Sequence, residues 1–143
     1  MRMVLDTNVL VSALINPDGL PDQLLQRWEA DEFTLVTSAE QLDEVERVLA
    51  YEKLQRFIRP EQASRLVANL HRFATFAENL PALAASTNPS DNVILATATA
   101  GNASHLVTGD KGDLLGLKQV GGVSIIAVRE ALELLDSVGD RLP

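Results

Sequence analysis

Short apolar runs alternate with amphipathic stretches along the whole chain. Each amphipathic stretch repeats its apolar residues at helical spacing, as Leu42, Val45 and Leu49 do. The apolar runs predict strands at residues 1–6, 33–36, 73–77, 105–108 and 123–127. Helices are predicted at residues 7–15, 22–30, 61–71, 93–100 and 129–137, with another after Ser38 and a short one within 109–116. Such alternation predicts an α/β fold, an α/β/α sandwich around a central parallel sheet of about five strands.

Two of the predicted helices have clear start signals. Ser38 and Gln41 have the spacing of a capping box. The segment 88–91 puts a proline in the cap region and Asp91 in the first turn, where the helix dipole favours an anion. No repeat, low-complexity stretch or linker interrupts the pattern, so residues 1–143 are expected to form a single domain.

The composition is that of an ordinary soluble globular protein, with 46% apolar and 22% charged residues. The chain has no cysteine, which excludes disulfides, zinc–thiolate sites and cysteine nucleophiles. A cysteine-free chain without a signal peptide fits a reducing cytoplasm. The apolar runs are far shorter than the roughly 20 residues that a membrane helix needs, so no membrane association is expected.

The formal net charge is −8, which by itself argues against a nucleic-acid partner. The charge is uneven, however, because residues 45–75 carry 6 basic and 3 acidic side chains, a balance of +3. The basic residues of this segment are Arg47, Lys53, Arg56, Arg59, Arg65 and Arg72. They form either a cationic face for phosphates or an ordinary solvated helical surface.

Four acidic positions are the best candidates for chemistry: Asp6, Glu44, Asp91 and Asp110. Asp6 and Asp110 each follow a predicted strand, so both are expected at the carboxyl edge of the sheet, where open α/β sheets bind ligands. Carboxylates that converge there repel one another unless a cation lies between them. Oxygen ligands of this kind suit Mg²⁺ or Mn²⁺.

Each of these acids also has an ordinary structural explanation. Asp6 could cap the helix that follows, and Asp91 could be only a first-turn acid. Asp110 could be a turn residue, and Glu44 one more surface charge. The shared sheet edge of Asp6 and Asp110 weakens these readings.

Two polar residues near the acids could support them. Asn8 lies two residues after Asp6, and Thr108 lies two residues before Asp110. Either side chain could orient a carboxylate or its bound water, as hydrogen-bonded partners of metal ligands do. A loop asparagine and a strand threonine are the ordinary alternatives.

Four motifs in this order resemble those of the PIN-domain nucleases, over essentially the whole chain. They are Asp-Thr-Asn-Val-Leu at 6–10, Glu-Val-Glu-Arg-Val-Leu at 44–49, Asn-Pro-Ser-Asp-Asn at 88–92 and Leu-Val-Thr-Gly-Asp-Lys at 106–111. The length also resembles that of VapC-type toxins of toxin–antitoxin pairs. Two positions depart from the family pattern: Asn88 stands where the family often has Asp, and Gly112 lengthens the spacing between Asp110 and Asp113.

The resemblance implies a Mg²⁺- or Mn²⁺-dependent ribonuclease whose catalytic quartet is Asp6, Glu44, Asp91 and Asp110. Asp6, Asp91 and Asp110 are the expected metal ligands, Glu44 a second-metal ligand or general base, and Asp113 a supporting residue. The family also implies a homodimer and an antitoxin partner. RNA is expected to lie along the basic segment, through Arg47, Lys53, Arg56, Arg59 and Arg65.

Other functions remain open from the sequence. A histidine-pair ribonuclease is disfavoured, because the chain has 2 histidines, His71 and His105, both predicted away from the acidic edge. A haloacid-dehalogenase-type phosphatase also begins with a strand and an aspartate, but it needs a second acid where this chain has Asn8. A non-catalytic module that binds RNA or protein is the third possibility.

Overall fold

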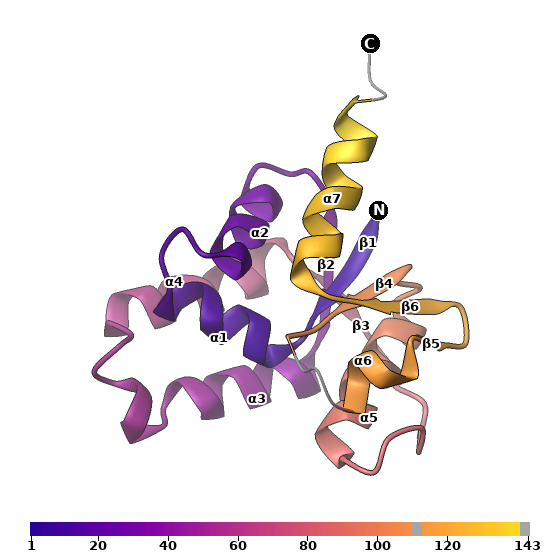
Figure 1. Ribbon diagram of the computed structural model, residues 1–143. Helices are drawn as coiled ribbons and strands as arrows, with labels where there is room; N and C mark the ends of the chain where they lie inside the picture. Colours follow the sequence, from indigo (N-terminus) through magenta and orange to yellow (C-terminus); the bar gives the residue numbers. More distant parts are fainter. Residues whose placement is uncertain (110–112, 141–143) are drawn as a thin grey trace.

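The computed structural model describes all residues except 110–112 and 141–143 (Figure 1). Its elements alternate as the apolar pattern predicts. The strands are β1 (Arg2–Leu5), β2 (Thr34–Ser38), β3 (Thr75–Ala77), β4 (His105–Val107), β5 (Gln119–Val120) and β6 (Val123–Ile126). The helices are α1 (Thr7–Ile15), α2 (Leu20–Glu29), α3 (Ala39–Leu49), the short 3₁₀ helix η1 (Glu52–Leu54), α4 (Pro60–Phe73), α5 (Pro89–Ala100), α6 (Asp113–Leu117) and α7 (Val128–Asp140).

The strands form one six-stranded sheet in the order β3-β2-β1-β4-β6-β5. All neighbouring pairs are parallel except β5–β6, which is antiparallel. The prediction of about five parallel strands therefore missed β5. This strand is only two residues long, and Gly121 and Gly122 make the turn into β6, with Gly121 at φ 58°. A two-residue strand is too short to show the alternating pattern on which the prediction rests.

Helices cover both faces of the sheet, which confirms the predicted α/β/α sandwich (Figure 1). Along β1, Met3 and Leu5 point into a core shared with α1–α4 and α7, whereas Val4 points into a second core shared with α5 and α6. The alternation follows from strand geometry, since successive side chains point to opposite faces. Because both faces are covered, the buried residues of the central strands β1 and β4 form continuous apolar runs instead of alternating with polar residues.

Two helix starts agree with their sequence signals. The Ser38 hydroxyl accepts a hydrogen bond from the Gln41 backbone N–H at 3.1 Å, as the capping-box spacing predicts. Asn88 accepts one from the Ser90 N–H at 3.0 Å, and Pro89 is the first residue of α5. Both caps lie at the carboxyl end of the sheet, so they fix how α3 and α5 leave that edge.

Gly101, at the end of α5, lets this helix lie close to the sheet. A Cβ atom placed there would be 2.4 Å from Cγ1 of Val36 in β2, a contact that no side chain could keep. The close approach seats α5 on β2 and thereby positions its opposite end, which carries Asp91. No helix among the described residues is long and apolar enough to cross a membrane.

Candidate active site at the carboxyl edge of the sheet

The strand order reverses at β1, which places a crevice beside its carboxyl end. The chain runs from β1 to β2 and β3 on one side, and β4 and β6 lie on the other. Ligands of open α/β sheets bind at such a switch point, because the connections from adjacent strands leave in opposite directions. Asp6 directly follows β1, and Thr108 directly follows β4. A backbone hydrogen bond from Asp6 N to Val107 O, 2.9 Å long, holds the two ends together.

The Asp6 side chain is buried in this crevice, with 7% of its surface exposed. Its Oδ2 accepts a hydrogen bond from the Thr108 hydroxyl at 2.9 Å. Asp6 immediately precedes α1, but its side chain makes no capping hydrogen bond to that helix. The carboxylate is held by the Thr108 hydroxyl at the neighbouring strand end, and the backbone N–H of Thr7 also favours its charged form.

Glu44 reaches the same region from α3. It is half-buried, and its Oε1 accepts a hydrogen bond from the hydroxyl of Thr7, the first residue of α1. The sequence pointed to Asn8 as the supporting residue next to Asp6. Asn8 is exposed on α1, and its side chain makes no hydrogen bond to any described residue. The supporting hydroxyl at this position is that of Thr7, one residue earlier.

Asp91 lies in the first turn of α5, with 8% of its surface exposed. Ser86, in the loop before the helix, donates a hydrogen bond from Oγ to Asp91 Oδ2 at 3.3 Å. Asn92 holds this loop in place by two hydrogen bonds to the Ser86 backbone, each 2.9 Å. Ser86 was not predicted from the sequence. Its only signal is a hydroxyl residue shortly before the helix start.

The three acids act on one another electrostatically. Burial raises the pKa of the Asp6 carboxyl above its ordinary value of 3.8. The hydrogen bond from Thr108 opposes that rise, whereas the negative charges of Asp91 and Glu44 add to it. Since Coulomb interactions weaken with distance, Asp91 and Glu44 each lie near enough to Asp6 to act on its carboxylate. We call Asp6, Glu44 and Asp91 the carboxylate pocket.

The donor set of this pocket consists of carboxylate oxygens oriented by hydroxyl groups, which suits a hard divalent cation. Among the described residues, no group of three or more Asp, Glu or His side chains is close enough to hold an ion. The fourth predicted acid, Asp110, lies outside the described residues. Asp113 begins α6, but its side chain is also outside the description.

A buried polar network supports the pocket from below. Gln41, 1% exposed, donates from Nε2 to the Leu5 carbonyl at 2.7 Å and accepts at Oε1 from the Thr37 hydroxyl at 2.7 Å. The hydroxyls of Ser38 and Thr97 are 2.8 Å apart and hydrogen-bonded to each other. Leu5 is the residue before Asp6. The network therefore fixes α3 and α5, which carry Glu44 and Asp91, relative to the end of β1.

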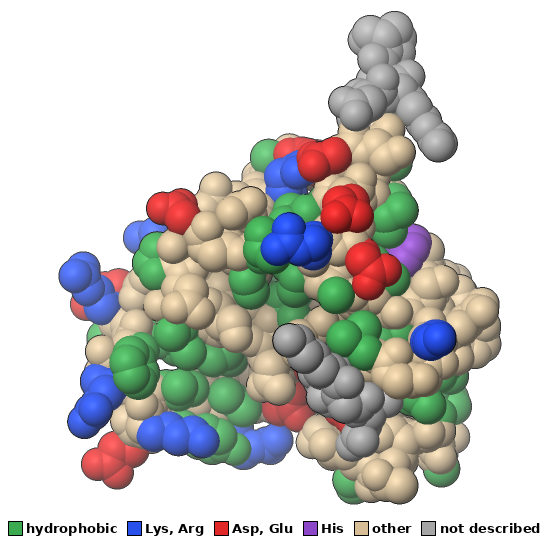
Figure 2. Space-filling model, viewed as in Figure 1, with side chains coloured by type: hydrophobic (Ala, Val, Ile, Leu, Met, Phe, Trp, Pro, Cys, Tyr) green, Lys and Arg blue, Asp and Glu red, His purple; other side chains and the backbone are tan. Residues whose placement is uncertain are grey.

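The predicted cationic residues lie at the other end of α3. Arg47, Lys53, Arg56 and Arg59 are exposed, and Figure 2 shows Lys and Arg side chains gathered over the α3–α4 end of the molecule. Arg65 is exposed too, but it lines a separate groove between α2 and α4. Ion pairs in the described part of the chain involve Arg27 and His71, and none involves these five cations.

Comparison with known proteins agrees with this arrangement. A family model described as PIN domain matches residues 2–112. An uncharacterized protein of Methanocaldococcus jannaschii is 30% identical over 128 residues, which cover 82% of this chain and 76% of that protein. PIN domains are typically nucleases that use divalent metal ions. The match spans β1 to β4, the elements that build the carboxylate pocket, and the chain therefore belongs to the PIN domain family.

Proposed function

We propose that this protein is a Mg²⁺- or Mn²⁺-dependent ribonuclease that hydrolyses phosphodiester bonds in RNA. The observation that carries the proposal is the position of Asp6. It is a carboxylate buried at the switch point of the sheet. Burial raises its pKa, and the charges of Asp91 and Glu44 raise it further. A fold tolerates such repulsion where function requires it, and perturbed acids in a cleft are typical of catalytic sites.

The residues of the pocket fit a divalent ion in chemistry. Asp6 and Asp91 would hold it, and Asp110 is added as a third ligand from its sequence motif. When bound, the ion would make a water molecule more acidic and neutralise charge on the phosphate.

The protein's own side chains have separate tasks. Thr108 donates to Asp6 Oδ2 and so fixes the direction of the carboxylate. Thr7 donates to Glu44 Oε1, and no described residue donates to Oε2. We assign to Oε2 the role of general base, accepting the proton of the water that attacks the phosphate. Asp113 is retained as a supporting residue on the strength of its motif.

RNA would approach along the basic residues. An RNA phosphate is repelled by a site made of carboxylates and by a net charge of −8. Arg47, Lys53, Arg56 and Arg59 offer charges that no carboxylate neutralises within the described residues, and Arg65 adds one on the next groove. Counterion release by these residues would supply the binding free energy that the pocket cannot.

None of the three rivals from the sequence gains support. A phosphatase of the haloacid-dehalogenase type needs a general acid at position 8, and Asn8 is exposed on α1 and has no acidic proton. A histidine-pair ribonuclease is also disfavoured. His105 lies at the amino end of β4, the edge of the sheet opposite the pocket, and burial lowers its pKa. A non-catalytic module is disfavoured because such a module has no need for buried carboxylates that repel one another.

We further propose that the protein is the toxin of a toxin–antitoxin pair, acts as a homodimer and binds an antitoxin protein. The support is the resemblance of its motifs and length to VapC-type toxins. Light scattering at micromolar concentration should give twice the mass of 15.5 kDa, and a clean monomer would count against the dimer. A short neighbouring reading frame that encodes a DNA-binding protein would support the antitoxin.

The decisive experiment compares Asp6→Asn and Glu44→Gln with Asp43→Asn. Asp43 is exposed on α3 next to Glu44, so it controls for the loss of one acid from that helix. Single-stranded RNA should be cleaved by the wild type and by Asp43→Asn when Mg²⁺ or Mn²⁺ is present. The two pocket variants should not cleave it. Equal cleavage by all four proteins would reject the proposed site.

A further inference from the structure

The connection between α3 and α4, residues 50–59, is a firmly anchored segment that we call the α3–α4 turn. Ile58 is 4% exposed, and Leu54 packs against the main core. Gln55 donates from Nε2 to the Leu49 carbonyl at 3.0 Å, which satisfies the end of α3. Backbone hydrogen bonds from Leu54 to Tyr51 and from Phe57 to Leu54 tighten the segment. The outward side chains are thus presented on a fixed backbone.

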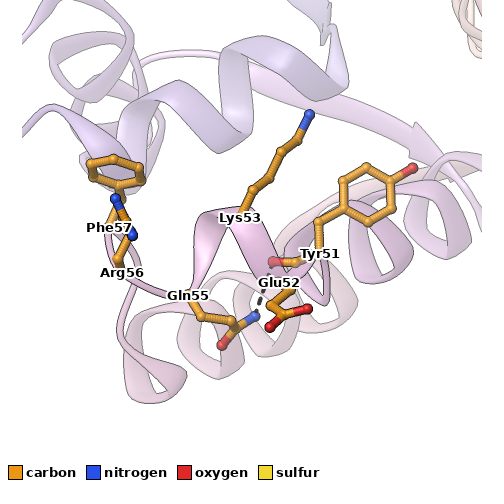
Figure 3. Close-up of a pocket in the computed structure, with 6 residues that line it drawn as sticks. All are labelled: Tyr51, Glu52, Lys53, Gln55, Arg56 and Phe57. Carbon is orange, nitrogen blue, oxygen red and sulfur yellow. Dashed lines mark hydrogen bonds between the residues drawn. The ribbon is translucent and has the colours of Figure 1, made fainter.

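Two of those outward side chains are aromatic. Tyr51 is 42% exposed and Phe57 is 56% exposed, although burial would be favourable for both rings. They line an open hollow of about 940 Å³ together with Glu52, Lys53, Gln55 and Arg56. Figure 3 shows Lys53 extending between the two rings and away from Glu52. Its Nζ lies 5.8 Å from the centroid of the Tyr51 ring.

Among the described residues, the cations of the hollow have no acidic partner, in contrast to Arg27. Arg27 pairs with Glu32 at 2.6 Å and with Asp136 at 2.9 Å. Within the described residues, Lys53 and Arg56 have no carboxylate within 4.0 Å. Exposed rings beside unneutralised cations are the composition of surfaces that bind single-stranded nucleic acid, where bases stack and phosphates are neutralised.

The turn lies within reach of the carboxylate pocket. Tyr51 follows Glu44 by seven residues along α3 and its end, which corresponds to about 10 Å along the helix axis. A strand that passes the pocket in this direction would meet the hollow next. The buried hydrogen bonds of Gln41 hold α3 in place, so the spacing between the carboxylate pocket and the α3–α4 turn is fixed.

We infer that the α3–α4 turn binds unpaired nucleotides of the RNA next to the cleaved bond. Tyr51 and Phe57 stack on bases, and Lys53 and Arg56 neutralise the adjoining phosphates. The inference rests on the proposed ribonuclease function and names its substrate class: RNA with an unpaired stretch. Bases within a duplex are stacked on one another and cannot lie on the rings, so paired RNA is bound more weakly.

The test measures RNA binding in an Asp6→Asn background, where the substrate stays intact. The probes are a single-stranded oligonucleotide and a blunt-ended duplex without unpaired bases, each labelled for fluorescence anisotropy. Tyr51→Ala and Phe57→Ala should each weaken single-strand binding by about 5- to 150-fold, the range for loss of one stacked base. Tyr51→Phe, which keeps the ring, should bind as the parent does.

Phe73→Ala is the matched control. Phe73 is 65% exposed and also has a cation beside it, Arg72, whose guanidinium carbon is 5.9 Å from the ring centroid. It lies at the end of α4, outside the hollow. Its substitution should leave RNA affinity unchanged. An equal loss in Phe73→Ala, Tyr51→Ala and Phe57→Ala would overturn the inference, since it would show that any exposed ring contributes.

Salt dependence separates stacking from charge. Loss of a ring should weaken binding without changing the slope of log K against log salt, because no phosphate contact is lost. Equal affinity of the Tyr51→Ala, Phe57→Ala double variant and its parent would overturn stacking. Equal affinity for the duplex and the single strand would overturn the preference for unpaired nucleotides. A variant that changes only the oligomeric state would show that the turn is a protein contact, which also overturns the inference.

The two proposals fail in different ways. If RNA is cleaved by the wild type but binding is indifferent to both rings, the inference fails and the ribonuclease stands. If binding depends on the rings but the wild type never cleaves RNA with Mg²⁺ or Mn²⁺, the ribonuclease proposal fails. In that case the turn is still a site for single-stranded RNA, and only its link to a cleaved bond is overturned.

Discussion

Helix α3 joins two regions with opposite surroundings. Its first half carries Glu44 into the carboxylate pocket, where Asp6 and Asp91 are more than nine-tenths buried and accept hydrogen bonds from hydroxyl groups. Its end leads into the α3–α4 turn, where two rings are exposed and, among the described residues, Lys53 and Arg56 have no carboxylate partner. The carboxylate pocket orients its acids although their like charges repel one another. The α3–α4 turn keeps its rings and cations accessible to solvent. If the proposed function holds, catalysis and RNA binding lie in separate regions that one helix connects.

The largest effect expected from this comparison is a loss of cleavage without a loss of binding. Asp6→Asn should abolish metal-dependent RNA cleavage and keep single-strand affinity within about twofold of wild type, since the RNA contacts lie elsewhere. Cleavage assays with Mn²⁺ and anisotropy on the same oligonucleotide check this. A parallel loss of both activities would show that the two regions are not separate.

The second prediction compares two glutamines that both donate to backbone carbonyls. Gln41→Leu should destabilise the protein by about 2 kcal/mol or more, because the Leu5 carbonyl and the Thr37 hydroxyl lose buried partners. Gln55→Leu, on the exposed turn, should change stability by less than about 0.5 kcal/mol. Urea unfolding of the two variants measures the difference. Similar costs would mean that the pocket is no more firmly held than the turn.

The third prediction follows from the raised pKa of Asp6. The folded state of the metal-free protein binds its proton more tightly than the unfolded chain does. The resulting stability is fully present below pH 3.8 and is lost as pH rises through the folded pKa. At pH 7 in EDTA, Asp6→Asn should therefore melt at a higher temperature than wild type.

Metal ions should reverse this order of melting temperatures, so that the wild type melts above Asp6→Asn. At 100 times its dissociation constant, Mg²⁺ or Mn²⁺ should stabilise the wild type by about 2.7 kcal/mol by mass action. Asp6→Asn should gain little, and the control Asp43→Asn should gain as much as wild type. Thermal melting with and without the ion measures both effects. Equal stabilisation of all three proteins would place the ion elsewhere.

The smallest effects concern single cations. Lys53→Gln and Arg56→Gln should each lower the salt slope of single-stranded RNA binding by about 0.7, the value for one phosphate contact. Arg27→Gln should leave it unchanged, because Arg27 is already paired with Glu32 and Asp136. Binding titrations at several salt concentrations give the slopes. An equal change in all three variants would reduce the turn to a general electrostatic surface.

Local patterns were enough to predict most of the fold. The apolar runs of β1, β2, β4 and β6 are long enough to stand out, and the capping residues Ser38 and Asn88 mark where α3 and α5 begin. The two-residue strand β5 carries no such pattern. Its pairing with β6 depends on the tight turn at Gly121, a tertiary feature that periodicity does not reveal.

The site was only partly predictable for a related reason. Thr108 was expected to support a carboxylate, and its hydroxyl donates a hydrogen bond to Asp6, which lies far from it in the sequence. Thr7 was not predicted, because its contact with Glu44 depends on the direction in which its side chain points from α1. Successive helical residues point about 100° apart, so Thr7 faces Glu44 while Asn8 faces solvent. Ser86 contacts Asp91 through a loop conformation that no sequence spacing specifies.

The two edge strands of the sheet also limit how copies of this protein could associate. β3 has three residues and β5 has two, so each edge exposes only a short row of unpaired backbone groups. Short edge strands of this kind discourage a second sheet from extending the first by strand addition. A dimer, if it forms, would therefore be built from helix faces instead of from a sheet that continues from one copy into the next.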